Sequence, residues 1–346
     1  MTRAAAQSRW RRSWPWLGAF IGIAALAWVL RAFDFGRFRA ILAEADGRFL
    51  LLVPIAIATE QWVRAWKWRQ ILYPMRAIGT LRLFGAIMAG YLAGLLIPFG
   101  FSALARAWLV ARRDDLPMSA VLATVALDRL TDGVIFALLV PIVLLLVAFP
   151  DPTGGIRAAL AWGATGSFAL FALLLVALAL YKRGALRSGG WLVRFVERLP
   201  ARIVGPVKRV ATSFATGIVW PREFWRGLGI LIATVLIKLI AATHFLWAGF
   251  AFGVTLEAAH YLFLMVFLGF VVIIGHFVRI AGTFVIGGIF ALGLFGVAEE
   301  RALAMVLTVQ AASLLTVAGI GAFSLWRQGV GLAELRTAGR SNAGSG

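Results

Sequence analysis

Long apolar runs recur through this chain and restrict what it can fold into. Runs of about 18 residues or more are typical of helices that cross a bilayer, and they occur from one end of the sequence to the other. Helices satisfy their own backbone hydrogen bonds, which lipid cannot do. The sequence therefore predicts an all-α, polytopic integral membrane helix bundle with about 7–9 spans. The expected spans are 16–33, 48–66, 82–98, 117–149, 157–181, 224–252, 258–277, 280–297 and 302–326.

Composition supports a membrane protein and leaves no room for a sizeable soluble domain. Hydrophobic residues make up 62% of the chain and charged residues 14%, whereas soluble domains carry roughly 25% charged residues. We expect a single transmembrane domain over 1–326 and a partly disordered tail over 327–346. The chain has no cysteine, which excludes disulfides and cysteine-bound metal. We predict no cofactor.

The net charge of +19 is explained by a membrane location. The basic residues lie beside the apolar spans, as is typical of the cytoplasmic loops of membrane proteins. Anionic lipid headgroups are therefore expected partners, and nucleic acid is not. Residues 1–15, 64–82 and 182–222 are the basic segments. They place the N-terminus in the cytoplasm of a bacterial inner (plasma) membrane, with 16–33 as a retained signal anchor. Segment 182–222 favours interfacial helices on an anionic leaflet; the alternative is a solvated basic linker.

Two segments predict re-entrant helical hairpins. Arg106, Arg112 and Arg113 follow span 82–98 and should lie on the cytoplasmic side, which requires the chain to turn back at Pro98 and Gly100. Helix breaks are also expected in the glycine-rich segment after residue 279, at Gly282, Gly287 and Gly288. Segments 97–127 and 279–309 share an outline, each with a break, an acidic pair and an Ala-rich span. This suggests an internal repeat.

Three charges interrupt the apolar run at 122–140. Asp128 and Asp132 share a helix face, and Arg129 can reach Asp132; Arg106 on the neighbouring hairpin is the expected neutralising partner. Charges at the bilayer centre face a bundle interior or a cavity. Three interpretations stay open: an ion network that only holds the bundle together, a group that guides a polar headgroup, or an interfacial position.

Other charges lie in or near the spans. Glu60 and Arg64 are one turn apart, Lys238 lies within 224–252, and Arg279 precedes the glycine-rich segment. Each could line a path for a headgroup, although packing or snorkelling is the alternative for the basic ones.

Enzyme signatures are scarce. The sequence contains no H-E-x-x-H, P-loop or G-x-S-x-G motif. The spacing of Asp128 and Asp132 is superficially similar to magnesium–diphosphate sites of membrane prenyltransferases, which need more carboxylates on facing helices. We therefore expect no enzyme and no metal site; an intramembrane transferase would require a divalent cation.

Two stretches carry a resemblance to a known family. The segments WVRAWKWRQIL (62–72) and GYLAGLLIPFGFSALARAWLVARRDDLPMSAVLATVALDRLTDG (90–133) resemble the flippase-like family named for the lysylphosphatidylglycerol synthase transmembrane region. The similarity continues weakly through 279–304. The matching positions are Trp66, Lys67, Trp68, Arg69, Gly90, Pro98, Gly100, Arg106, Asp128, Arg129, Asp132 and Gly133.

The resemblance implies a lipid transporter without the soluble aminoacyl-transfer domain of the synthases. Phe99, Ser102, Ala281 and Gly288 stand where the family has more polar residues or proline. A thinner polar path suits a less polar cargo, such as a hopanoid or another isoprenoid lipid, and some similar members are associated with hopanoid synthesis. The alternative is a non-transporting accessory or scaffold for lipid-biosynthesis proteins.

Overall fold

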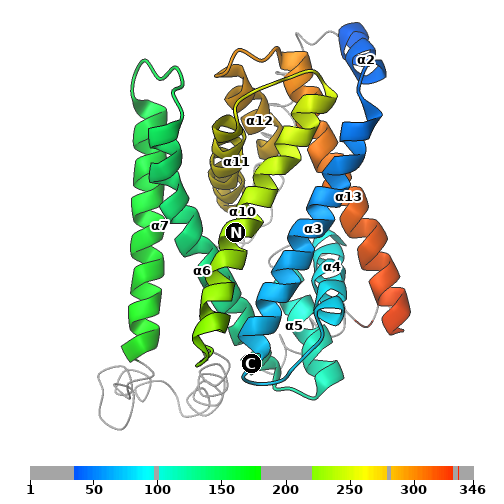
Figure 1. Ribbon diagram of the computed structural model, residues 1–346, viewed down its shortest axis with the longest axis vertical. Helices are drawn as coiled ribbons and strands as arrows, with labels where there is room; N and C mark the ends of the chain where they lie inside the picture. Colours follow the sequence, from blue (N-terminus) through cyan, green and yellow to red (C-terminus); the bar gives the residue numbers. More distant parts are fainter. Residues whose placement is uncertain (1–34, 97–100, 181–219, 279–281, 330–333, 335–346) are drawn as a thin grey trace, which may run out of the picture. The chain divides into compact units, whose positions relative to one another are not determined.

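The structure is a computed structural model that describes residues 35–96, 101–180, 220–278, 282–329 and 334. Every regular element in these residues is an α-helix, which confirms the all-α prediction (Figure 1). Span 16–33, residues 182–219 of the basic segment and nearly all of the tail after Gly329 lie outside the described residues. The helices are α2 (Phe35–Ala43), α3 (Gly47–Leu72), α4 (Thr80–Leu96), α5 (Phe101–Asp114), α6 (Met118–Leu146), α7 (Gly155–Leu180), α10 (Phe224–Ala251), α11 (Ala258–Val278), α12 (Thr283–Gly293) and α13 (Glu299–Gln328).

The long helices follow the predicted apolar runs closely. Span 117–149 is α6, 224–252 is α10 and 302–326 is α13. Among the described residues, these three helices are long and apolar enough to cross a membrane. Their apolar side chains surround the helix on all sides, which is typical of lipid-embedded helices. Leu145, Leu315 and Trp326 are exposed on the protein surface, as expected where lipid is the solvent.

Helix α3 corrects the sequence prediction at one end. We expected a span over 48–66 followed by a cytoplasmic loop from residue 64, but α3 continues to Leu72. Two further turns form because their polar residues find partners and their apolar residues are covered. Lys67, Trp68 and Leu72 are each 0% exposed. The basic residues at 64, 67 and 69 are therefore helical.

The chain divides into two compact units, each described by itself. The first unit comprises the described residues within 1–56, 139–164 and 241–312, which include α2, α11 and α12 whole. Its centre is aromatic: the ring of Phe263 lies 4.9 Å from Phe149 and 5.3 Å from Phe295 between centroids. The second unit comprises the described residues within 57–138, 165–240 and 313–346, which include α4 and α5 whole and the end of α13. Its core gathers Trp68, Leu83, Ile87, Leu109 and Val125 among others.

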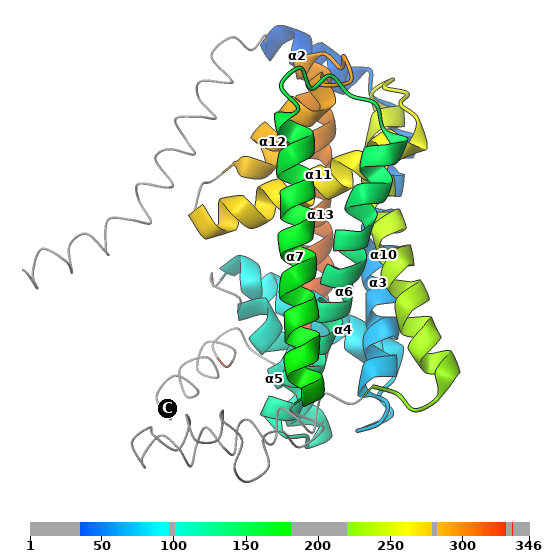
Figure 2. The same ribbon diagram turned by 90° about the vertical axis from the view of Figure 1, so that its left-hand side faces the viewer.

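Helices α4 and α5 form a hairpin in the second unit (Figure 2). Gly94 faces Ser102, and Gly90 faces Arg106, so the two helices run antiparallel. A Cβ atom on Gly90 would lie 2.8 Å from the Ser102 carbonyl oxygen, so only glycine permits this approach. At 1.5 Å per residue the helices are about 25 and 21 Å long, short of a roughly 30 Å hydrocarbon core. These lengths suit the expected re-entrant hairpin, whose turning residues Pro98 and Gly100 lie outside the described residues.

A second consecutive pair, α11 and α12, packs together in the first unit (Figure 2). Gly282 precedes α12 with φ 76°, a left-handed conformation that favours glycine. The expected breaks at Gly287 and Gly288 are wrong, because both lie inside α12. They are packing sites instead: a Cβ on Gly287 would lie 2.8 Å from Val271, and one on Gly288 would lie 2.5 Å from Val306.

Helix order repeats along the chain. A long helix, a shorter helix, a short helix and a long helix follow one another as α3–α6 and again as α10–α13. The two acidic pairs noted in the sequence lie near equivalent connections, with Asp114 at the end of α5, before α6, and Glu299 at the start of α13, after α12. The order of the helices thus extends the suggested repeat to four helices in each of its two copies.

Candidate functional site

A cluster of ionised side chains lies buried in the second unit. It is formed by α3, α5 and α6, and we call its six members the ion network: Glu60, Arg64, Lys67, Arg106, Asp128 and Asp132. Every member is at most 8% exposed, and Lys67, Arg106 and Asp128 are 0% exposed. Helical spacing creates the cluster, because the three α3 residues follow one another at intervals of four and three, and the two aspartates at an interval of four.

Asp132 is held by two cations from α3. Arg64 Nη1 donates a hydrogen bond to Asp132 Oδ2 at 2.5 Å, and Lys67 Nζ donates one to Oδ1 at 2.6 Å. Arg64 Nη2 also donates to Glu60 Oε1 at 3.1 Å, one turn away on α3. Charge-assisted hydrogen bonds of this length are strong. They tie the C-terminal part of α3 to the middle of α6.

Lys67 connects the two aspartates. Its Nζ atom lies 3.0 Å from Asp128 Oδ1 and also donates to the Asp128 carbonyl oxygen at 3.1 Å. Trp68, the next residue, donates from Nε1 to Thr124 Oγ1 at 3.0 Å, one turn before Asp128 on α6. The α3–α6 contact is therefore polar at successive turns.

Arg106 brings the hairpin into the ion network. Its Nη2 atom donates to Asp128 Oδ2 at 3.2 Å, so the expected contact between Arg106 and the α6 charges is formed. Its guanidinium carbon lies 5.1 Å from the centroid of the Trp68 ring, a cation–π distance. Nε and Nη1 of Arg106 are buried and have no hydrogen-bond partner among the described residues. Unpaired buried donors are costly, so these two atoms are well suited to bind an anionic oxygen.

Charges within the ion network balance, with three cations against three carboxylates. The structure leaves other predicted residues outside it. The expected Arg129–Asp132 pair is wrong: Arg129 is exposed on α6, and Arg64 and Lys67 occupy both oxygens of Asp132. Lys238 lies 5.6 Å from the ring centroid of Phe136. Arg279 lies outside the described residues.

Lys67 is the member of the ion network whose role the sequence did not predict. It matched the family motif, but it fell in the basic segment 64–82 that was expected to follow span 48–66, whereas α3 continues to Leu72. Its spacing from Glu60 and Arg64, on one face of a helix and opposite to two acids elsewhere, was the signal that could have found it.

The repeated element order has no second ion network at the same places. Asp128 and Asp132 are residues 11 and 15 of α6; the residues at these places in α13 are Val309 and Ser313. The same succession of helices therefore forms without carboxylates there.

Comparison with known protein families identifies the family of this chain. The family described as the lysylphosphatidylglycerol synthase transmembrane region matches residues 16–321. The chain belongs to this family. It is therefore a multi-pass membrane protein of a flippase-like, lipid-related family, as the motifs around Arg106 and Asp128 predicted. Searches among curated proteins and solved structures found no match.

Proposed function

We propose that this member of the lysylphosphatidylglycerol synthase transmembrane-region family is a lipid transporter. It moves a polar-headed or isoprenoid lipid, such as a hopanoid, across or along a bacterial inner membrane, and it carries out no enzymatic step. The observation that carries the proposal is the buried ion network, in which two donors of Arg106, Nε and Nη1, have no hydrogen-bond partner among the described residues.

Energetics support a functional origin of the ion network. Desolvating ions costs several kcal/mol each, and replacing buried ion networks by apolar residues is often neutral or stabilising. Stability alone therefore does not require these charges. The residues at the same places in α13, Val309 and Ser313, support this argument, since that helix is built without them. Ionisable residues within a membrane indicate a substrate path.

Arg106 is the residue that we expect to meet the headgroup. Its guanidinium is fixed by Asp128 and the Trp68 ring, which leaves Nε and Nη1 to bind phosphate or hydroxyl oxygens of a lipid. A guanidinium presents its donors in a planar fork that lysine lacks.

Charge-conserving substitutions test this role. Arg106→Lys and Asp132→Glu should lower lipid movement at least about tenfold, the effect of losing one charge-assisted hydrogen bond of roughly 1.5–3 kcal/mol. The measurement is dithionite quenching of a fluorescent phosphatidylglycerol, and separately of a fluorescent isoprenoid lipid, in phosphatidylethanolamine–phosphatidylglycerol vesicles.

Arg76→Lys is the matched control, since Arg76 is exposed in the connection between α3 and α4. It should move both probes at the wild-type rate. If Arg106→Lys and Asp132→Glu also retain the wild-type rate while remaining folded, the ion network is not a transport path. An accessory or scaffold role would then be the better explanation.

We also propose that the N-terminus is cytoplasmic and that the α4–α5 hairpin is re-entrant. The chain has no cysteine, so single cysteines can be labelled without background. Cysteines at Arg76 and Arg113, on either side of the hairpin, should both react with a membrane-impermeant maleimide only after the cytoplasmic face is opened. Labelling of the two positions from opposite faces would contradict the hairpin.

A further inference from the structure

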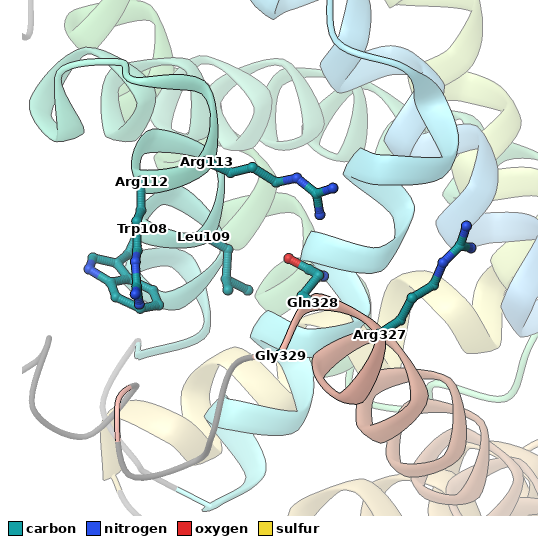
Figure 3. A pocket seen from close by; sticks show the side chains of 7 residues that line it. All are labelled: Trp108, Leu109, Arg112, Arg113, Arg327, Gln328 and Gly329. Atoms are coloured by element: carbon teal, nitrogen blue, oxygen red, sulfur yellow. The ribbon is translucent and has the colours of Figure 1, made fainter.

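A pocket separate from the ion network lies where α5 and α13 end in the second unit. Its volume is about 290 Å³, close to the lower end of the roughly 300–1,000 Å³ typical of ligand sites. We call it the α5–α13 pocket (Figure 3). It is lined by Trp108, Leu109, Arg112, Arg113, Arg327, Gln328 and Gly329.

Three of the residues that line this pocket are arginines. Figure 3 shows Arg113 extending from α5 toward the end of α13, where Gln328 lies, with Arg327 on the far side of Gln328. Within the part of the chain that the structure describes, Arg113 and Arg327 have no carboxylate within 4.0 Å. The positive charge of the pocket is thus only partly compensated.

Arg112 shows how an anion binds here. Its Nη1 atom donates to Glu334 Oε2 at 2.6 Å, and its guanidinium carbon lies 5.0 Å from the centroid of the Trp108 ring. The ring holds the arginine in place from one side, and a carboxylate oxygen occupies the other partner position. One arginine of the pocket lining therefore already binds a carboxylate from its own chain.

Helix ends explain single arginines but not this arrangement. A cation in the last turn of a helix interacts favourably with the helix dipole, which accounts for one basic residue at each end. The dipole does not account for three arginines from two helices lining one cavity, where their charges attract the same anion. Guanidinium groups bind phosphate through two parallel hydrogen bonds, and the side-chain amide of Gln328 adds a neutral donor.

We infer that the α5–α13 pocket is a binding site for a phosphate group, carried either by a lipid headgroup or by free phosphate. Arg113 and Arg327 bind its oxygens, and Arg112 contributes when Glu334 is displaced. The site is distinct from the ion network and does not depend on the proposal of lipid transport.

Isothermal titration calorimetry of the full chain in a non-ionic detergent tests the site. The two probes are short-chain dihexanoyl phosphatidic acid and inorganic phosphate. Arg113→Ala with Arg327→Ala should weaken binding at least about tenfold, because two charge-assisted contacts are lost. Glu334→Gln should tighten binding about two- to fivefold, the usual strength of an exposed ion pair that competes with the probe.

The probes separate the two sources of phosphate. Lipid that binds more tightly than inorganic phosphate identifies a headgroup site, and equal affinities identify a free-phosphate site. Arg113→Lys with Arg327→Lys keeps the charge and should show intermediate affinity, which guards against a misfolded alanine variant.

Arg76→Ala with Arg222→Ala is the matched control, since it removes two exposed arginines outside the pocket. It should bind both probes as the wild type does. The inference is overturned if the wild type binds neither probe, if the Arg113 and Arg327 variants bind normally, or if this control weakens binding equally.

Discussion

Replacing Asp132 by asparagine should destabilise the protein by about 3–5 kcal/mol, the usual cost of removing one partner from a buried ion pair. Asp132 accepts hydrogen bonds from Arg64 and Lys67 at 2.5 and 2.6 Å, so its loss leaves the buried ion network with an excess positive charge. Lys67→Met should be similarly harmful, because it leaves excess negative charge beside Asp128. Equilibrium unfolding in detergent micelles, followed by circular dichroism, measures both changes.

The double variant Lys67→Met with Asp132→Asn makes this prediction specific. It removes one cation and one carboxylate, so the remaining four charges balance again. We expect it to be more stable than either single variant, with a coupling within the roughly 0.5–3 kcal/mol typical of contacting residues. Additive losses in the double variant would show that the charges of these two residues are not balanced against each other.

Gly90→Ala should lower the free energy of unfolding by about 1–3 kcal/mol, the range observed for overpacked interiors. A Cβ at this position would lie 2.8 Å from the Ser102 carbonyl oxygen and 2.9 Å from Arg106 Cβ. Both neighbours are on α5, so the hairpin must open and shift Arg106 away from Asp128. The same unfolding measurement detects the loss, and lipid movement should fall with it.

Gly319→Ala is the matched control for Gly90→Ala. Gly319 lies within α13, and a Cβ there would meet nothing within 4 Å. Alanine is favoured over glycine in helix interiors by up to about 1 kcal/mol, so this variant should be neutral or more stable. If both alanine variants have the same stability, close packing at Gly90 is not required.

The fold could be predicted from the sequence because its signals are local. Apolar length placed α6, α10 and α13 within a few residues of their observed bounds, and loop charge together with Pro98 and Gly100 indicated the α4–α5 pair. The C-terminal end of α3 was harder to predict from the sequence. Taken alone, Arg64 and Lys67 have the character of loop charges, because burying them is favourable only when their partners on α6 are present.

The predicted role of the glycines near α12 was right only where it depended on local structure. Gly282 marks a turn through its own left-handed backbone, which is a local property. Gly287 and Gly288 sit in regular helix, and the neighbours that require glycine there, Val271 and Val306, come from α11 and α13. Composition alone does not separate a glycine that breaks a helix from one that lets two helices approach.

The sequence by itself determined the class of this protein: an all-helical, multi-pass member of a lipid-related family, with charges placed inside apolar helices. Hydrophobic length is enough for the helical, membrane-spanning class, and the resemblance carried by residues 62–72 and 90–133 indicated the family. Only the tertiary structure decided which charges meet. It placed Lys67 between Asp128 and Asp132, left Arg129 exposed, and gathered three arginines around the α5–α13 pocket. Pairing across helices depends on their rotation and close approach, which are set by packing between segments far apart in the chain.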